Sequence, residues 1–142
     1  MIKKIPYSLL LLCLLLAVPA AVAEVAIIMH PDATDSSISI REVSDVFLGK
    51  SRRLRDGTTL LPLDQRNDSK VKERFYLEVT HKSAAQLKAY WARQVFTGQG
   101  TPPLMLNSDQ DIRELVSKNP NMIGYIDSAY VDDTVRVMLL ID

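Results

Sequence analysis

The chain has 142 residues, with 17 basic and 17 acidic side chains and a formal net charge of zero. This balance provides no electrostatic footprint for nucleic acid or for an anionic membrane surface, so we expect no nucleic-acid partner. The single cysteine, Cys13, lies in an N-terminal apolar stretch, and the rest of the chain therefore lacks a thiol for a disulfide, a metal site or a nucleophile.

The first 23 residues have the pattern of a secretory signal peptide. Lys3-Lys4 precedes the apolar run Leu9–Val18, and Ala21-Val22-Ala23 has the small residues that a signal peptidase requires. The apolar run is too short to span a bilayer comfortably. We therefore expect residues 1–23 to be cleaved and residues 24–142 to form one periplasmic domain with a net charge of about −2.

The first half of the mature sequence alternates between strand and helix patterns. The apolar, β-branched run Glu24–Met29 predicts a buried strand. The segment from Ser39 to about Leu48 predicts a helix that the serine caps and a glycine ends. Thr59–Leu63 predicts a second strand, in which Pro62 indicates a sheet edge or a strand end.

The second half continues this alternation. We expect a polar turn at Asp64–Asp68, helices from about Ser69 to Val79, from Ser83 to Phe96 and after Ser108, and strands at Met122–Ile126 and Thr134–Ile141. Gly98–Pro103 breaks the pattern and predicts an irregular connection. Strands that alternate with helices predict an α/β domain with a mixed sheet flanked by helices and at least some parallel pairing.

The segment Asp64–Lys70 is the strongest candidate for a binding site, because a polar turn leads there from a strand end into a helix. The unpaired N–H groups at a helix start carry partial positive charge and attract anions. Arg66 adds a planar donor fork and Ser69 a hydroxyl. The alternative is capping alone, with Arg66 as a solvated charge. Asp68 would repel a fully ionised anion but could accept a hydrogen bond from a protonated one.

Other patterns give weaker signals. His30 and His81 have no second ligand at helical spacing, so we expect no metal site. No nucleophile–base pair can be assembled from the sequence, so we expect neither an enzyme nor a bound cofactor. Tyr90 and Trp91 lie on the apolar stripe of their helix, which favours core packing over the alternative of a ligand-stacking platform.

An ordered set of short motifs resembles phosphate-type periplasmic substrate-binding proteins. The motifs are Val46-Phe47-Leu48-Gly49-Lys50, Asp56-Gly57, Arg66-x-x-Ser69, Phe96-Thr97-Gly98, Pro102-Pro103 and Ile123-Gly124-Tyr125. The resemblance covers nearly all of residues 38–126 and implies the type II periplasmic-binding-protein fold. Complete proteins of this family have two lobes that close on the ligand and need roughly twice this length, so the resemblance implies a single lobe.

The same resemblance implies where a ligand would bind. The implied oxyanion ligands are Arg66, Ser69 and Lys70 at the helix start, and Ser36 and Ser37 on the loop after the first strand. In the phosphate binders a Ser-Gly-Thr follows the arginine and lets backbone amides approach the anion. Here a lysine and a valine follow Ser69, and the spacing from arginine to serine is one residue shorter.

Two functions follow from these observations. The first is a periplasmic solute-binding protein, like the phosphate-binding component of an ABC transporter, that binds phosphate or a similar oxyanion. The second is a single-lobe interaction or sensor-accessory module that has lost small-ligand binding and docks on a membrane transporter or sensor. A homodimer is a further arrangement, in which two copies would build a closed cleft.

Overall fold

The structure is a computed structural model that describes residues 23–33 and 37–142. The expected signal peptide up to Val22 lies outside the described residues, as does Ser36. The elements in chain order are β1 (Val25–Met29), α1 (Ile40–Phe47), β2 (Leu61–Gln65), α2 (Lys70–Thr80), α3 (Ala84–Phe96), β3 (Leu104–Leu106), α4 (Asp109–Lys118), β4 (Met122–Asp127), the 3-10 turn η2 (Ser128–Tyr130) and β5 (Arg136–Ile141).

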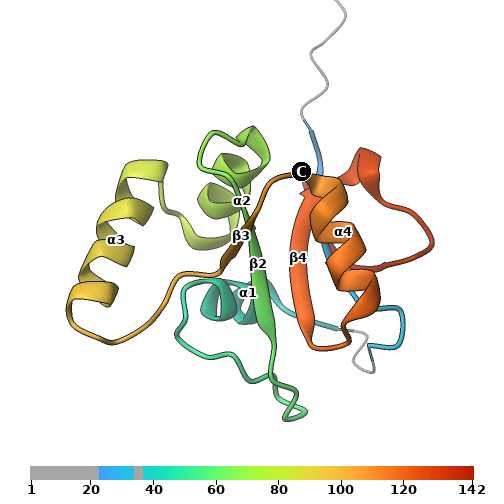
Figure 1. The fold of residues 1–142 in the computed structure, drawn as a ribbon, viewed down its shortest axis with the longest axis horizontal. Coiled ribbons are helices and arrows are strands. Elements are labelled where there is room, and N and C mark those ends of the chain that lie inside the picture. Colours follow the sequence, from blue (N-terminus) through green and yellow to red (C-terminus); the bar gives the residue numbers. More distant parts are fainter. Residues whose placement is uncertain (1–22, 34–36) are drawn as a thin grey trace, which may run out of the picture.

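The described strands form one mixed five-stranded sheet with the order β3-β2-β4-β1-β5 (Figure 1). β2 runs parallel to β3 and β4, whereas β1 runs antiparallel to β4 and β5. The predicted α/β class and the predicted parallel pairing are therefore confirmed. In the described part of the chain, none of the helices combines the length and hydropathy that crossing a membrane requires.

Helices cover both faces of the sheet. α1 and α2 pack on one face and α4 on the other, while α3 lies at the outer side of α2 (Figure 1). β1 is buried along its whole length: Val25, Ile27 and Met29 join the core under α1 and α2, and Ala26 and Ile28 join the core under α4. This two-sided burial explains why β1 is a continuous apolar run rather than an alternating one.

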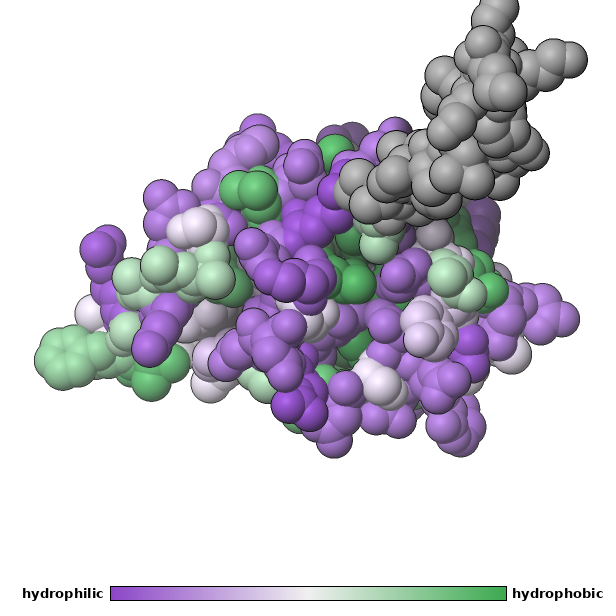
Figure 2. Space-filling view, turned by 90° about the horizontal axis from the view of Figure 1, so that it is seen from above, coloured by the Kyte–Doolittle hydropathy of each residue, from purple (hydrophilic) through white to green (hydrophobic). Residues whose placement is uncertain are grey.

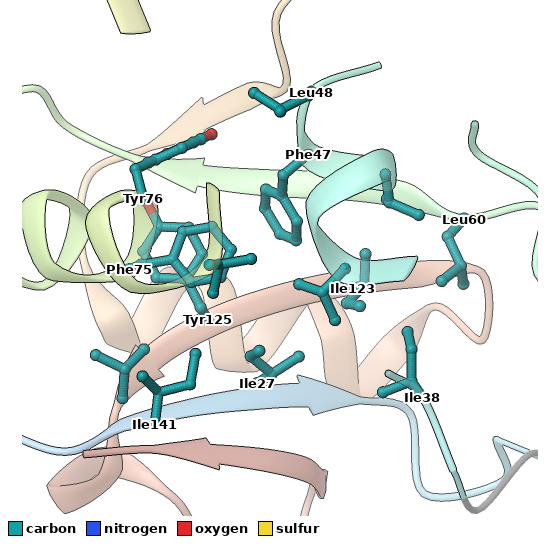
Figure 3. Close-up of a cluster of buried hydrophobic side chains, with 14 of the residues drawn as sticks. Ile27, Ile38, Phe47, Leu48, Leu60, Phe75, Tyr76, Ile123, Tyr125 and Ile141 are labelled. Atoms are coloured by element: carbon teal, nitrogen blue, oxygen red, sulfur yellow. The ribbon is translucent and has the colours of Figure 1, made fainter. Parts of the chain in front are cut away.

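Aromatic rings fill the core under α1 and α2 (Figure 3). The rings of Phe75 and Tyr125 stack with centroids 3.9 Å apart, and Phe47 meets Phe75 edge-on at 4.7 Å. Both arrangements suit the charge distribution of aromatic rings, so they add to the free energy gained from burying their area. The stack ties α2 to β4 across the sheet surface.

The predicted helix starts are confirmed. The residues that cap the helices are Ser39, Ser69, Ser83 and Ser108, each of which accepts an N–H of its first turn. At α1 the capping box is complete, because the Glu42 carboxylate accepts the Ser39 N–H in return. Serine caps satisfy donors that a helix start otherwise leaves unpaired, and this is why they mark helix boundaries in a sequence.

One prediction about the sheet was wrong, and one strand was missed. Asp64 and Gln65, expected in a polar turn, are buried at the end of β2. β3 was not predicted, because it is a three-residue strand that follows a Gly/Pro-rich segment. Pro62 lies near the start of β2, before the pairing with β3 begins at Leu63, so no hydrogen bond to β3 is lost there.

Gly124 allows close packing between β4 and α4. A Cβ atom at this position would lie 2.5 Å from Cγ2 of the buried Ile112. Any side chain would therefore push α4 away from the sheet or force Ile112 from its rotamer.

We therefore expect Gly124→Ala to lower the free energy of unfolding by about 1–3 kcal/mol, measured by urea denaturation. Gly100→Ala is the matched control, because a Cβ there would meet only the Trp91 ring at 3.7 Å. Equal stabilities of the two variants would show that α4 has room to move.

Candidate functional site

The candidate site lies where β2 and β3 end side by side. These two strands are parallel neighbours, and Gln65 at the end of β2 is in register with Leu106 at the end of β3. α2 follows β2 on one face of the sheet, whereas α4 follows β3 on the other (Figure 1). In open α/β sheets, such a divergence leaves a crevice outside the carboxyl ends of the strands, where ligands commonly bind.

A solvent-open hollow of about 450 Å³ occupies this position, and we call it the switch-point hollow. Its lining comes from the end of β2, from the loop and cap that lead into α2, from the start of α4 and from η2, namely Gln65, Arg66, Asp68, Ser69, Asn107, Ser108, Asp109, Gln110 and Tyr130. The caps of two helices, Ser69 of α2 and Ser108 of α4, therefore line one hollow. Each start carries partial positive charge, which makes the hollow suitable for an anion.

Serine caps organise both helix starts. The Ser69 hydroxyl oxygen accepts the Lys72 N–H at 3.1 Å, and the Ser108 hydroxyl oxygen accepts the Asp111 N–H at 3.1 Å. The capping role predicted for Ser69 is therefore confirmed. The remaining N–H groups of each first turn have no acceptor within the helix, as at every helix start.

Gln65 joins the two helix starts; it lies in the predicted candidate segment but was not among the predicted oxyanion ligands. Its side chain is buried; the amide nitrogen donates to Asp109 Oδ1 at 2.8 Å and to the Tyr125 carbonyl at 3.0 Å. The amide oxygen accepts the Ser69 hydroxyl. One side chain thus fixes the first turn of α2 relative to the first turn of α4. The sequence placed Gln65 inside the polar turn predicted at Asp64–Asp68 and gave no sign of its buried partners.

Among the described residues that line the hollow, Arg66 is the only basic one. Its Nη2 lies 3.1 Å from Asp68 Oδ2, and both side chains are more than half exposed. Such an exposed ion pair contributes little stability, so an incoming anion can replace Asp68 at small cost. Asp109, in the first turn of α4, adds a second carboxylate to the lining.

Two of the predicted ligands lie elsewhere. The Lys70 side chain is 91% exposed, its ammonium lies 3.4 Å from Glu73, and it does not line the hollow. Ser37 follows β1, which runs antiparallel to β4 and hence opposite to β2, so it lies at the other end of the sheet. The structure thus brings Arg66 and Ser69 together without Lys70 or Ser37.

A buried ionic cluster stabilises the other side of the loop between β2 and α2. The Lys72 ammonium lies 3.2 Å from Asp64 Oδ2, and the two side chains are only 10% and 5% exposed. Hydroxyl groups of Tyr76 and Tyr125 both donate to the same carboxylate. Burial, together with the charge of Asp64, raises the pKa of both tyrosines well above the usual range, so they remain neutral donors.

The same ammonium also holds the loop itself. Lys72 Nζ donates to the Gln65 carbonyl at 3.2 Å and to Asn67 Oδ1 at 3.0 Å. Its three donors therefore all have acceptors, which a buried charge requires. Among the described residues, no group of three or more histidine, cysteine, aspartate or glutamate side chains is arranged to hold a metal ion.

Comparisons with known proteins place the fold. No protein-family model and no curated protein matches the sequence. A Clostridium perfringens protein described as a phosphate ABC transporter substrate-binding protein, with phosphate bound, superposes with a TM-score of 0.64 and 21% identity over 81% of this chain and 44% of its own. An ABC-type phosphate transport receptor from Vibrio cholerae superposes with a TM-score of 0.64 and 15% identity, over 82% of this chain and 46% of its own. PstS from Borrelia burgdorferi superposes with a TM-score of 0.57 and 15% identity, over 76% of this chain and 42% of its own.

These matches confirm the fold expected from the motifs. The chain has the α/β fold of phosphate-type substrate-binding proteins, and it spans less than half the length of the solved structures that it matches. One lobe of the two-lobed fold accounts for this coverage.

The buried ion pair makes a direct prediction about stability. Lys72→Met leaves the Asp64 carboxylate buried without a countercharge, so the free energy of unfolding should fall by about 3–5 kcal/mol in urea denaturation. Lys70→Met, two residues earlier on the same helix and exposed, should change it by less than about 1 kcal/mol. Adding Asp64→Asn to Lys72→Met should restore part of the loss. Equal effects of the two lysine substitutions would contradict a buried pair.

Proposed function

We propose that this protein is an exported solute-binding protein that binds phosphate or a similar protonated oxyanion in the switch-point hollow. The observation that carries the proposal is the convergence of two capped helix starts on one hollow that also contains Arg66. Anions at such helix starts gain from both the free N–H groups and the helix dipoles.

In this proposal Arg66 turns from Asp68 to the anion and supplies a planar pair of N–H donors. First-turn amides of α4, whose residues Asp109 and Gln110 line the hollow, supply further donors. Ser69 acts mainly as the cap, because its hydroxyl proton is already donated to Gln65. Lys70 makes no direct contact with the anion, because its side chain is exposed and does not line the hollow.

The acidic residues of the hollow favour a protonated ligand. Asp68 and Asp109 line it together with Arg66, so the side chains there carry one more negative than positive charge. A fully ionised anion such as sulfate would be repelled. Hydrogen phosphate keeps a proton that a carboxylate can accept, which turns the repulsion into a hydrogen bond. Phosphate should therefore be preferred over sulfate.

The fold supports the cellular setting of the proposal. The solved proteins that share it are described as substrate-binding components of phosphate transport. Together with the N-terminal signal pattern, this favours a protein that works in the periplasm and delivers its ligand to a membrane transporter. The proposal includes no chemical change to the ligand and no bound cofactor.

Thermal unfolding of residues 24–142 tests the proposal. Phosphate should raise the melting temperature and sulfate should raise it much less, because a ligand selective for the native state stabilises it. Arg66→Ala should weaken phosphate binding by at least about tenfold, or about 1.4 kcal/mol. Arg93→Ala, which removes an exposed arginine from α3, is the control and should bind like the wild type.

A folded protein whose melting temperature responds to neither anion would contradict the proposal. That result would favour the second function, a single-lobe module that docks on a membrane transporter or sensor. If phosphate stabilises Arg66→Ala as much as it stabilises the wild type, the binding site lies outside the switch-point hollow.

A further inference from the structure

A second concavity lies on the other side of the loop between β2 and α2. It has a volume of about 550 Å³ and runs between α2, α3 and the segment before β3, and we call it the α3 groove. Its lining is Asp64, Asn67, Lys72, Glu73, Tyr76, Ala84, Ala85, Leu87, Lys88, Trp91, Pro102, Pro103 and Met105. A largely apolar lining with a few polar groups is typical of small-molecule sites.

The walls of the groove are apolar and held in place. The apolar part of the lining includes Leu87 and Trp91 from α3, together with Pro103 and Met105. The Tyr90 hydroxyl donates to the Leu48 carbonyl at 2.7 Å, which anchors α3 to the end of α1. The neighbouring Trp91 ring packs edge-on against Tyr90 with centroids 5.2 Å apart. Figure 2 shows apolar side chains at the surface of the end of the molecule where α3 lies.

The charges at the groove cancel. The floor holds the buried pair of Lys72 and Asp64, and the rim carries Glu73 and Lys88. Every countercharge that a charged ligand would meet is already paired. The free-energy cost of desolvating that ligand would therefore not be offset by a new ion pair. Charge complementarity therefore favours a neutral ligand.

The floor offers one exchangeable hydrogen bond. Two acceptors of the Lys72 ammonium, Asp64 and the Gln65 carbonyl, are buried and belong to the fold. The third acceptor is the side-chain amide oxygen of Asn67, an exposed residue that lines the groove. A ligand carbonyl can replace this oxygen with no change in charge or in the number of hydrogen bonds.

We propose that the α3 groove binds a small neutral molecule with a flat apolar body and one carbonyl group. The body contacts the apolar lining formed by Leu87, Trp91, Pro103 and Met105. The carbonyl accepts a hydrogen bond from Lys72 in place of Asn67. This site is separate from the switch-point hollow and does not depend on anion binding.

Trp91 is the only tryptophan of the chain, so tryptophan fluorescence reports directly on binding in the α3 groove. The probe is 6-propionyl-2-(dimethylamino)naphthalene, which is flat and neutral and carries one ketone. Titration into residues 24–142 should quench Trp91 emission by energy transfer and shift the probe emission to the blue with the same saturable dependence. No saturable change up to the solubility limit of the probe would overturn the proposal.

Two substitutions on α3 locate the site. Ala85 lines the groove and Ala89 does not, and both are exposed, so a phenylalanine at either position should leave the fold intact. Ala85→Phe fills the groove and should weaken probe binding by at least about tenfold, whereas Ala89→Phe should change it by less than about twofold. Equal binding by the two variants would place the probe elsewhere and overturn the proposal.

The hydrogen bond from Lys72 has its own test. Asn67→Ala removes the competing oxygen, so the ketone probe should bind several-fold more tightly, whereas 2-(dimethylamino)naphthalene, which lacks the carbonyl, should not. If the ratio of the affinities for the two probes is the same in Asn67→Ala as in the wild type, the assignment of a carbonyl ligand is overturned. Neither titration contains phosphate, so failure here is distinguishable from failure of the proposed anion site.

Discussion

At the end of β2, two adjacent polar side chains are buried on opposite faces of the sheet. Successive residues of a strand alternate between faces, so Asp64 meets Lys72 and the tyrosines under α2 while Gln65 meets the start of α4. Asp64 and Gln65 are adjacent in one strand, so their positions are fixed relative to each other. Asp64 holds α2 against the sheet through Lys72 and Tyr76, and Gln65 links the first turn of α2 to the first turn of α4. The switch-point hollow and the α3 groove both depend on this placement of α2.

Burying Asp64 and Lys72 costs free energy that a simple ion pair does not recover. The cluster persists because every donor of Lys72 has an acceptor and both tyrosines donate to Asp64. Replacement of the pair by apolar side chains would conserve the packing but would release the loop carbonyl of Gln65 and the amide of Asn67. We infer that the cluster specifies the loop conformation more than it stabilises the domain.

The helix starts could be predicted because their caps act within one turn of the chain. The features that the prediction missed depend on contacts between residues far apart in the sequence. Serine caps such as Ser69 and Ser108 act within one turn, so their positions mark helix starts in the sequence. Burial of Asp64 depends on Lys72 eight residues later and on Tyr125 in another strand, and no local pattern records those partners. Residues 104–106 form a strand because they pair with β2. Gln65 has a structural role because its side chain bonds to Asp109 at the start of α4. Both contacts depend on how the strands and helices are arranged in space, which the local sequence does not show.

The loop from Gln65 to Ser69 separates two environments that suit different ligands. On the hollow side, the start of α4 and Arg66 face solvent, where water weakens Coulomb attraction. In the proposed anion site, the preference for phosphate therefore comes mainly from hydrogen bonds to Asp68 and Asp109, and Gln65 helps to set their geometry by fixing the two helix starts relative to each other. On the groove side, charges are paired and the lining is largely apolar, so the proposed neutral ligand is selected by shape and by one exchangeable hydrogen bond. Because the Lys72 ammonium contacts both the Gln65 carbonyl and Asn67, one buried charge holds the backbone between the two sites.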